Sequence, residues 1–101
     1  MKRPTTLTGK QRRQLKALAH DLAPIVQIGN KGITPELLDA VNQALDDHEL
    51  IKVRVSESAP LDRKTAGSLL ADPSSAHDIG TIGRIVILYR RHPDAPQIPL
   101  S

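Results

Sequence analysis

The stretch Ile25-Val26-Gln27-Ile28-Gly29-Asn30-Lys31-Gly32-Ile33-Thr34-Pro35-Glu36 decides how this chain folds. It begins as a short apolar run over residues 25–28, which is typical of a buried strand. The run breaks at two glycines, and the chain resumes as a helix with Thr34 as N-cap and Pro35 in the first helical position. The stretch therefore predicts a strand, a Gly-x-x-Gly loop and a helix in succession.

The predicted loop, Gly29-Asn30-Lys31-Gly32, has the chemistry of an anion site. A turn that leads into a helix bares backbone N–H groups beside the positive end of the helix dipole. Glycine lets a phosphate reach that backbone, because a Cβ would hold the phosphate away. Two glycines at this spacing are more often only a turn, and the nearby acids Glu36 and Asp39 count against an anion unless they point away. Both interpretations stay open at this point.

The region before this stretch predicts an amphipathic helix with a basic face. Thr8 and Gln11 have the spacing of a capping box. Leucines then recur at helical intervals, and Pro24 is expected to end the helix. Three cations lie off the apolar stripe: Arg12, Arg13 and Lys16.

The region after the loop predicts a helix over residues 35–48 and a strand over residues 50–55. The helix carries its apolar side chains on one face. The strand alternates between apolar and basic residues, so Lys52 and Arg54 should point to solvent. If this strand neighbours the one at residues 25–28, the unit is a right-handed parallel crossover.

The last third of the domain predicts a helix and a hairpin. A loop over residues 56–60 leads into a weak helical pattern over residues 61–71, which Asp72-Pro73 is expected to close. Residues 79–90 are typical of two strands joined by a two-residue type II′ turn at Gly83-Arg84. The second of these strands is apolar throughout, which favours burial on both of its faces.

The order of elements is therefore α-β-α-β-α-β-β. It predicts a compact single α/β domain in which three helices pack a four-stranded mixed sheet. We expect the domain over residues 8–91, between a flexible basic N-terminus over residues 1–7 and a mobile, proline-containing tail over residues 92–101.

The composition of the 101 residues narrows the functional classes. The net charge is +3, but residues 1–20 hold six bases and no acid, whereas residues 33–51 hold five acids and no base. Such a positive side favours a phosphodiester backbone as the partner, with a merely solubilising face as the alternative. Tyr89 is the only aromatic residue, so the chain cannot build the platform on which RRM and OB sheets stack bases.

Neither an enzyme nor a metal protein is indicated. The chain has no cysteine, and its four histidines, His20, His48, His77 and His92, lack the spacing of a metal site. No serine stands in a nucleophile context, and the glycine loop is not a Walker loop. With no apolar run long enough for a membrane span, we expect a soluble, cytoplasmic monomer without a cofactor.

Four blocks of the chain together resemble the CRM domain, which is named for chloroplast RNA splicing and ribosome maturation. The resemblance covers about residues 8–91 and is to the single-domain bacterial form, the YhbY-like proteins. The blocks are Leu18-Ala19-His20, residues 24–34, residues 48–55 and residues 82–90. The chain departs from the family pattern at Asp72-Pro73-Ser74-Ser75 and at His77-Asp78.

The resemblance implies a fold similar to the C-terminal domain of translation initiation factor 3, with a KH-like Gly-x-x-Gly loop. It also implies RNA binding, and in bacteria an association with precursors of the large ribosomal subunit, so the expected partner is precursor rRNA. The alternative is an adaptor that docks on ribosomal proteins or on an assembly GTPase without touching RNA.

The resemblance also points to the residues that would bind RNA. Many relatives have two basic residues between the glycines, whereas Asn30 takes one of those places here and leaves Lys31 as the main cation. The basic face of the first helix and three further cations extend the expected surface. The expected RNA-binding residues are Gly29, Asn30, Lys31, Gly32, Lys10, Arg12, Arg13, Lys16, Lys52, Arg54 and Arg84.

Overall fold

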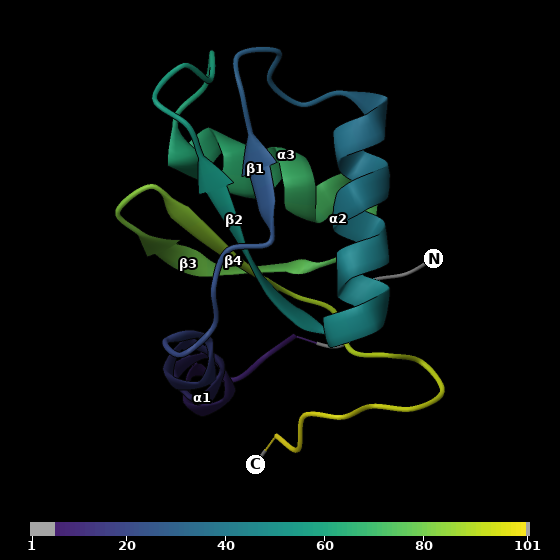
Figure 1. The fold of residues 1–101 in the computed structure, drawn as a ribbon. Coiled ribbons are helices and arrows are strands. Elements are labelled where there is room, and N and C mark those ends of the chain that lie inside the picture. Colours follow the sequence, from purple (N-terminus) through teal and green to yellow (C-terminus); the bar gives the residue numbers. More distant parts are fainter. Residues whose placement is uncertain (1–5, 101) are drawn as a thin grey trace.

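The computed structural model describes residues 6–100, in which three helices alternate with the strands of one sheet (Figure 1). In chain order the elements are α1 (Gly9–Ala19), β1 (Val26–Ile28), α2 (Pro35–His48), β2 (Leu50–Val55), α3 (Arg63–Ser74), β3 (His77–Ile82) and β4 (Ile85–Tyr89). The predicted order of elements and the predicted α/β class are confirmed. Of the N-terminal segment predicted as flexible, residues 1–5 lie outside the described part of the chain.

The four strands are arranged in the order β1-β2-β4-β3. β1 runs parallel to β2, as predicted for a strand–helix–strand unit, and the other neighbours are antiparallel. β3 and β4 form the predicted hairpin, in which Ile82 pairs with Ile85 across a two-residue turn. Gly83 has a φ of 59°, whereas Arg84 has no positive φ, as a type II′ turn requires.

Each face of the sheet is packed by different helices. α2 and α3 cover one face and enclose the larger core cluster, to which β4 contributes Val86 and Leu88. α1 covers part of the other face, where Ile87 and Tyr89 join the smaller cluster. β4 is therefore buried on both faces, as its continuous apolar sequence predicted. Within residues 6–100, no helix is both long and apolar enough to cross a membrane.

Local capping signals set where the helices begin. Thr8 and Gln11 form the predicted capping box, with both reciprocal hydrogen bonds at 3.0 Å. The hydroxyl of Thr34 accepts a hydrogen bond of 3.1 Å from the backbone N–H of Leu37, which confirms it as the N-cap of α2. These caps depend on residues three apart in sequence, which explains why the pattern alone located them.

The predicted end of α1 was wrong, because the helix stops at Ala19 and not at Pro24. The ammonium group of Lys52 donates hydrogen bonds to the carbonyls of His20, at 3.4 Å, and Leu22, at 2.9 Å. A cation from a distant strand thus satisfies carbonyl groups that the helix end leaves open, and the chain can turn toward β1.

The predicted end of α3 was also wrong, because the helix continues through Pro73 to Ser74. A proline in the last turn removes only one helical hydrogen bond, and the hydroxyl of Ser74 donates to the carbonyl of Leu70 at 2.6 Å. The helical pattern was weak because of Gly67, where a Cβ would lie 2.4 Å from Oδ2 of Asp78. The missing side chain at Gly67 leaves room for the side chain of Asp78 on β3. β3 begins at His77 and not at the predicted residue 79.

The C-terminal segment contacts the domain at a few points. Its backbone hydrogen-bonds to Glu49, and Figure 1 shows it looping out and returning below the sheet, while the mobility of residues 92–101 stays a prediction. Ile98 and Leu100 pack on the smaller core cluster, as does Leu7 from the other end of the chain. The segment has no regular secondary structure, because its prolines cannot donate to a strand ladder.

Candidate nucleic-acid interface

The Gly-x-x-Gly loop lies beyond the C-terminal end of β1, at the upper end of the sheet in Figure 1. Hydrogen bonds tie this end together: the N–H of Ser56 donates to the carbonyl of Ile28 at 3.0 Å, and the N–H of Val55 donates to the carbonyl of Arg84 at 2.7 Å. The glycine loop, the end of β2 and the β3–β4 turn therefore form one continuous edge. We call this edge the loop end of the sheet.

The two glycines of the loop have different structural roles. Gly32 is buried with a φ of +70°, and a Cβ on it would lie 3.2 Å from Cγ of Pro60. The fold itself therefore requires glycine at this position. Gly29 has an ordinary φ, and a Cβ on it would meet nothing within 4 Å. The fold does not require glycine there, and the space beside it is open.

The backbone amides of the loop are mostly available to a ligand. The N–H of Gly32 donates to the carbonyl of Gly29 at 3.0 Å, which closes the turn and removes that amide from the expected set. Within residues 6–100, the N–H groups of Gly29, Asn30 and Lys31 have no hydrogen-bond acceptor. Three successive donors thus face solvent at the start of the connection to α2.

Three of the predicted cations lie at the loop end. Lys31 is exposed within the loop, and Arg84 is exposed at the β3–β4 turn. Arg54 is exposed on β2, opposite Ile85 of β4 and Gln27 of β1. In the described part of the chain, none of these three cations forms an ion pair with a carboxylate. Their charge is available to a polyanion.

The cations of α1 lie elsewhere. α1 packs near the beginning of β1, at the opposite end of the strand from the glycine loop (Figure 1). Arg12 donates to the carbonyl of Asp78, and the stem of Lys16 covers Gly80. Lys10, Arg13 and Lys16 are exposed, whereas Arg12 is half-buried. The structure thus does not join the basic face of α1 to the loop as one compact patch.

Lys52 is the other predicted residue that lies apart from the loop end. Its side chain is half-buried, and its ammonium group is engaged by the carbonyls at the end of α1. The prediction that β2 turns two cations to solvent therefore holds for Arg54 alone.

The acids Glu36 and Asp39 are exposed in the first turns of α2. Figure 1 shows α2 on one side of β1 and the strands β2 and β4 on the other. The negative charge near the loop is therefore on the α2 side, whereas Arg54 and Arg84 are on the sheet side. A polyanion at the loop would be drawn toward the sheet side.

The structure adds two cations that the sequence reasoning did not single out. Arg63 and Lys64 are exposed in the first turn of α3, directly after the loop whose Pro60 touches Gly32. The backbone N–H of Thr65 donates to the carboxylate of Asp62 at 2.8 Å, and this bond is the main reason that the pKa of Asp62 is lowered. The sequence shows Arg63 and Lys64 directly after the N-cap residue Asp62. Their place at the loop end depends on the packing of Pro60 beside Gly32, which the sequence does not show.

Comparison with known proteins agrees with this structure. A family model described as the CRS1 / YhbY (CRM) domain matches residues 7–90. The "Probable RNA-binding protein YqeI" of Bacillus subtilis is 36% identical over 94 residues, which cover 93% of this chain and 98% of that protein. An "RNA-binding protein" of Haemophilus influenzae is 38% identical over 96 residues, with coverages of 94% and 97%.

A solved structure shows the same fold. The solution structure of SAV1595 from Staphylococcus aureus superposes with a TM-score of 0.80 at 34% sequence identity. The match covers 95% of this chain and all of that one, at 100%. From the family match and the relatives together, this chain belongs to the CRS1/YhbY (CRM) domain family.

Proposed function

We propose that this protein binds RNA at the loop end of its sheet, and that it grips the sugar-phosphate backbone and does not read bases. Relatives that match it over nearly their full length are named as RNA-binding proteins. The only aromatic side chain, Tyr89, is 1% exposed at the other end of β4. No Phe, Tyr or Trp ring is therefore available in residues 6–100 to stack on a base.

The openness of Gly29 is the observation that carries this proposal. The position has neither a positive φ nor a neighbour that a Cβ would strike, so the fold itself does not account for a glycine. Close approach of a phosphate does account for it, because the three free N–H groups at Gly29, Asn30 and Lys31 would then be within hydrogen-bond reach. Lys31 would neutralise that phosphate, and Arg54 and Arg84 would hold its neighbours along the strand.

We further propose that the RNA is a precursor of the large ribosomal subunit and that the protein acts as a cytoplasmic monomer in its assembly. Membership of the CRS1/YhbY (CRM) family supports this role. The likeness to the C-terminal domain of translation initiation factor 3 and the KH-like character of the loop remain predictions.

The salt dependence of RNA binding tests the proposal and locates the surface. If Lys31, Arg54 and Arg84 each neutralise one phosphate, the log–log slope of affinity against salt should be about −2 to −3. If Lys10 and Arg13 on α1 also take part, the slope should steepen to about −4 to −5. The measurement is a titration of a labelled large-subunit rRNA fragment at several salt concentrations, and a flat profile would remove the proposal.

If the protein is instead an adaptor that docks on a protein, its attachment to large-subunit precursors should not depend on RNA. Attachment to large-subunit precursors would then survive nuclease treatment and tolerate the change Lys31→Glu. Co-sedimentation of the full chain with precursor particles, with and without nuclease, separates the two functions.

A further inference from the structure

The carboxylate of Glu49 is unusual among the charged groups of residues 6–100. Glu49 lies between α2 and β2 with a left-handed φ of 63°, and it is only 2% exposed. No other carboxylate in the described part of the chain is buried to this degree. Burying a charge is costly unless the charge is paired or hydrogen-bonded. The hydrogen-bond partners of the Glu49 carboxylate therefore indicate which group it binds.

Those partners are all backbone N–H groups of the C-terminal segment. Oε2 accepts from the N–H of His92 at 2.7 Å. Oε1 accepts from the N–H of Gln97 at 2.7 Å and from the N–H of Ile98 at 2.9 Å. Within residues 6–100, no cation forms an ion pair with this carboxylate. Because the N–H groups of residues 92 and 97 reach the same carboxylate, the main chain between them forms a loop over Glu49, and the carboxylate binds main-chain groups and no charged side chain.

The remaining contacts of the segment are also independent of most of its side chains. The amide of Gln14 on α1 donates to the carbonyl of Pro99 at 2.7 Å. Only Ile98 and Leu100 bury apolar groups, on the smaller core cluster that contains Tyr89. Main-chain hydrogen bonds combined with a few apolar anchor side chains can hold a peptide without depending on the rest of its sequence.

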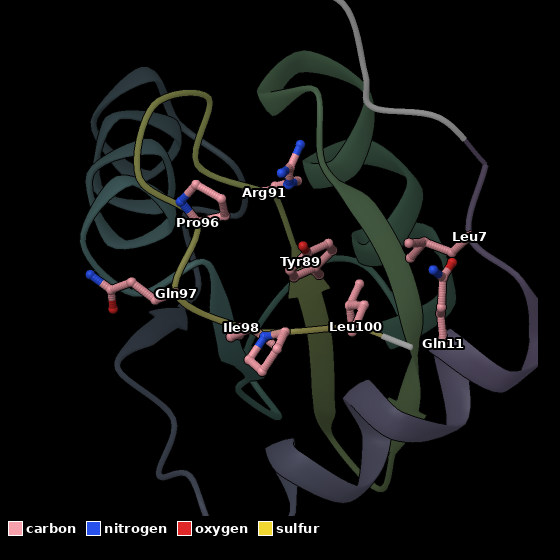
Figure 2. Close-up of a pocket in the computed structure, with 9 residues that line it drawn as sticks. Leu7, Gln11, Tyr89, Arg91, Pro96, Gln97, Ile98 and Leu100 are labelled. Carbon is pink, nitrogen blue, oxygen red and sulfur yellow. The ribbon is translucent and has the colours of Figure 1, made fainter.

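The groove under the segment is not completely filled. Figure 2 shows Tyr89 between the segment and the side chains of Leu7 and Gln11, in a pocket of about 590 Å³. Beyond Ile98, a second pocket of about 390 Å³ continues toward the β1 side of the molecule. Its lining includes three apolar residues that are 40–52% exposed: Leu18, Leu22 and Ile25.

We propose that this groove is a binding site for a peptide segment of a partner protein that loops over Glu49, and that residues 92–100 occupy it in cis as a competitor. The peptide would place two apolar side chains two residues apart, and it would present free N–H groups to Glu49, which excludes proline at the positions matching 97 and 98. The carboxylate repels phosphate, so this site is distinct from the RNA surface at the loop end. The second pocket would accept a further apolar side chain of the partner.

The test weakens the cis segment and leaves the groove intact. In the full chain, the double change Ile98→Ser with Leu100→Ser removes both apolar anchors of the segment. A labelled peptide with the sequence of residues 92–100 should then bind at least about tenfold more tightly to this variant than to the unmodified chain, because the competitor is weakened. Fluorescence anisotropy measures the affinity, and the same peptide with both serines serves as the matched control.

The site itself is tested by adding Glu49→Gln to the double variant. Peptide affinity should then fall by at least about tenfold, because a neutral amide offers one acceptor oxygen where the carboxylate offers two. The change Lys31→Glu should leave peptide binding unaltered, which keeps a failure at this groove distinguishable from a failure of RNA binding. Equal peptide binding by the unmodified chain and the double variant, or binding that ignores Glu49, would overturn the proposal.

Hydrogen exchange supplies a second measurement if the double variant does not fold. In the unmodified chain, the amides of Gln97 and Ile98 should exchange slowly, and an excess of the peptide should accelerate them by displacing the segment. Unchanged exchange would contradict the proposal. Acceleration by an rRNA fragment in place of the peptide would assign the groove to nucleic acid and would also contradict it.

Discussion

The two ends of the sheet treat backbone N–H groups in opposite ways. At the loop end, the amides of Gly29, Asn30 and Lys31 have no acceptor within residues 6–100 and face solvent beside exposed cations. At the Glu49 end, the amides of residues 92, 97 and 98 are all taken up by one buried carboxylate. Donors left in water cost the fold little and stay available to a ligand, whereas donors removed from water must be paired. One end therefore leaves backbone donors available to a ligand, and the other holds a segment of the chain itself.

The largest effect that separates the two ends is expected for Glu49→Gln. The neutral side chain turns an NH2 group toward N–H donors and loses charge-assisted hydrogen bonds, so the free energy of unfolding should fall by about 3 kcal/mol. For a domain of this size, the thermal midpoint should drop by about 12–24 °C. RNA affinity should not change, because the loop end is untouched.

Thermal denaturation and the RNA titration together check this prediction. Asp47→Asn is the matched control, because Asp47 is an exposed acid of the same helix end and accepts only from the side chain of Gln43. Its effect on stability should stay within about 0.5 kcal/mol. A Glu49→Gln protein as stable as the control would mean that the C-terminal segment contributes nothing to the fold.

The second largest effect is expected from alanine at the two glycines of the loop, where one change should affect stability and the other RNA binding. Gly32→Ala should lower the free energy of unfolding by about 1–2 kcal/mol, because its φ of +70° and the contact with Pro60 both disfavour a Cβ. Gly29→Ala should leave stability within about 0.5 kcal/mol and weaken RNA binding about threefold to tenfold. Chemical denaturation and RNA titration of both variants distinguish the roles, and a Gly29→Ala protein with unaltered affinity would argue against close phosphate approach.

A smaller effect, confined to binding, is expected from charge reversal. Lys31→Glu should weaken RNA binding about tenfold, or about 1.4 kcal/mol, with little change in the thermal midpoint, because Lys31 has no partner within residues 6–100. Lys10→Glu on α1 is the matched reversal at a distance from the loop. If both changes weaken binding equally, RNA contacts both surfaces, and the division between the loop end and α1 has no functional meaning.

The smallest expected effect concerns the titration of Tyr89 at the Glu49 end. Burial, and secondarily the charge of Glu49, raise the pKa of Tyr89 above its ordinary value of 10.0. Because the unfolded chain releases this proton first, the stability that Tyr89 contributes is present below pH 10.0 and is lost as the pH rises through the folded-state pKa. Ultraviolet absorbance of the phenolate reports this one side chain, since the chain has no other tyrosine and no tryptophan.

Glu49→Gln should lower the pKa of Tyr89, because it removes the nearby negative charge and loosens the covering segment. The loop variant Lys31→Glu serves as the control and should leave the titration unchanged. An unaltered titration in Glu49→Gln would show that the C-terminal segment does not shield Tyr89.

Much of the fold could be predicted from sequence because its signals are local. The strand–loop–helix stretch, the capping residues Thr8 and Thr34 and the turn at Gly83-Arg84 all depend on residues a few positions apart. The prediction failed where a distant residue decided the outcome. α1 ends at Ala19, and Lys52 hydrogen-bonds carbonyls just beyond that end, while Gly67 lies within α3 where the side chain of Asp78 fills the space beside it.

The candidate site divides in the same way. The sequence placed the glycine loop correctly, but it treated all basic residues as one surface. Charge composition carries no information on which cations share an edge of a sheet. Strand register puts Arg54 and Arg84 beside the loop, and the packing of α1 leaves Lys10 and Arg13 at the other end of β1.

By itself, the sequence determined the order of the elements and the presence of a glycine loop with one cation between its glycines, because short-range propensity and capping encode these features. The family followed from the resemblance of four sequence blocks and from the family match. Only the tertiary structure decided which glycine the fold requires, which cations surround the loop and that the last residues close a groove over Glu49. Those properties arise from contacts between backbone groups far apart in the chain. Backbone groups are the same in every residue except proline, so no sequence pattern records which of them will meet.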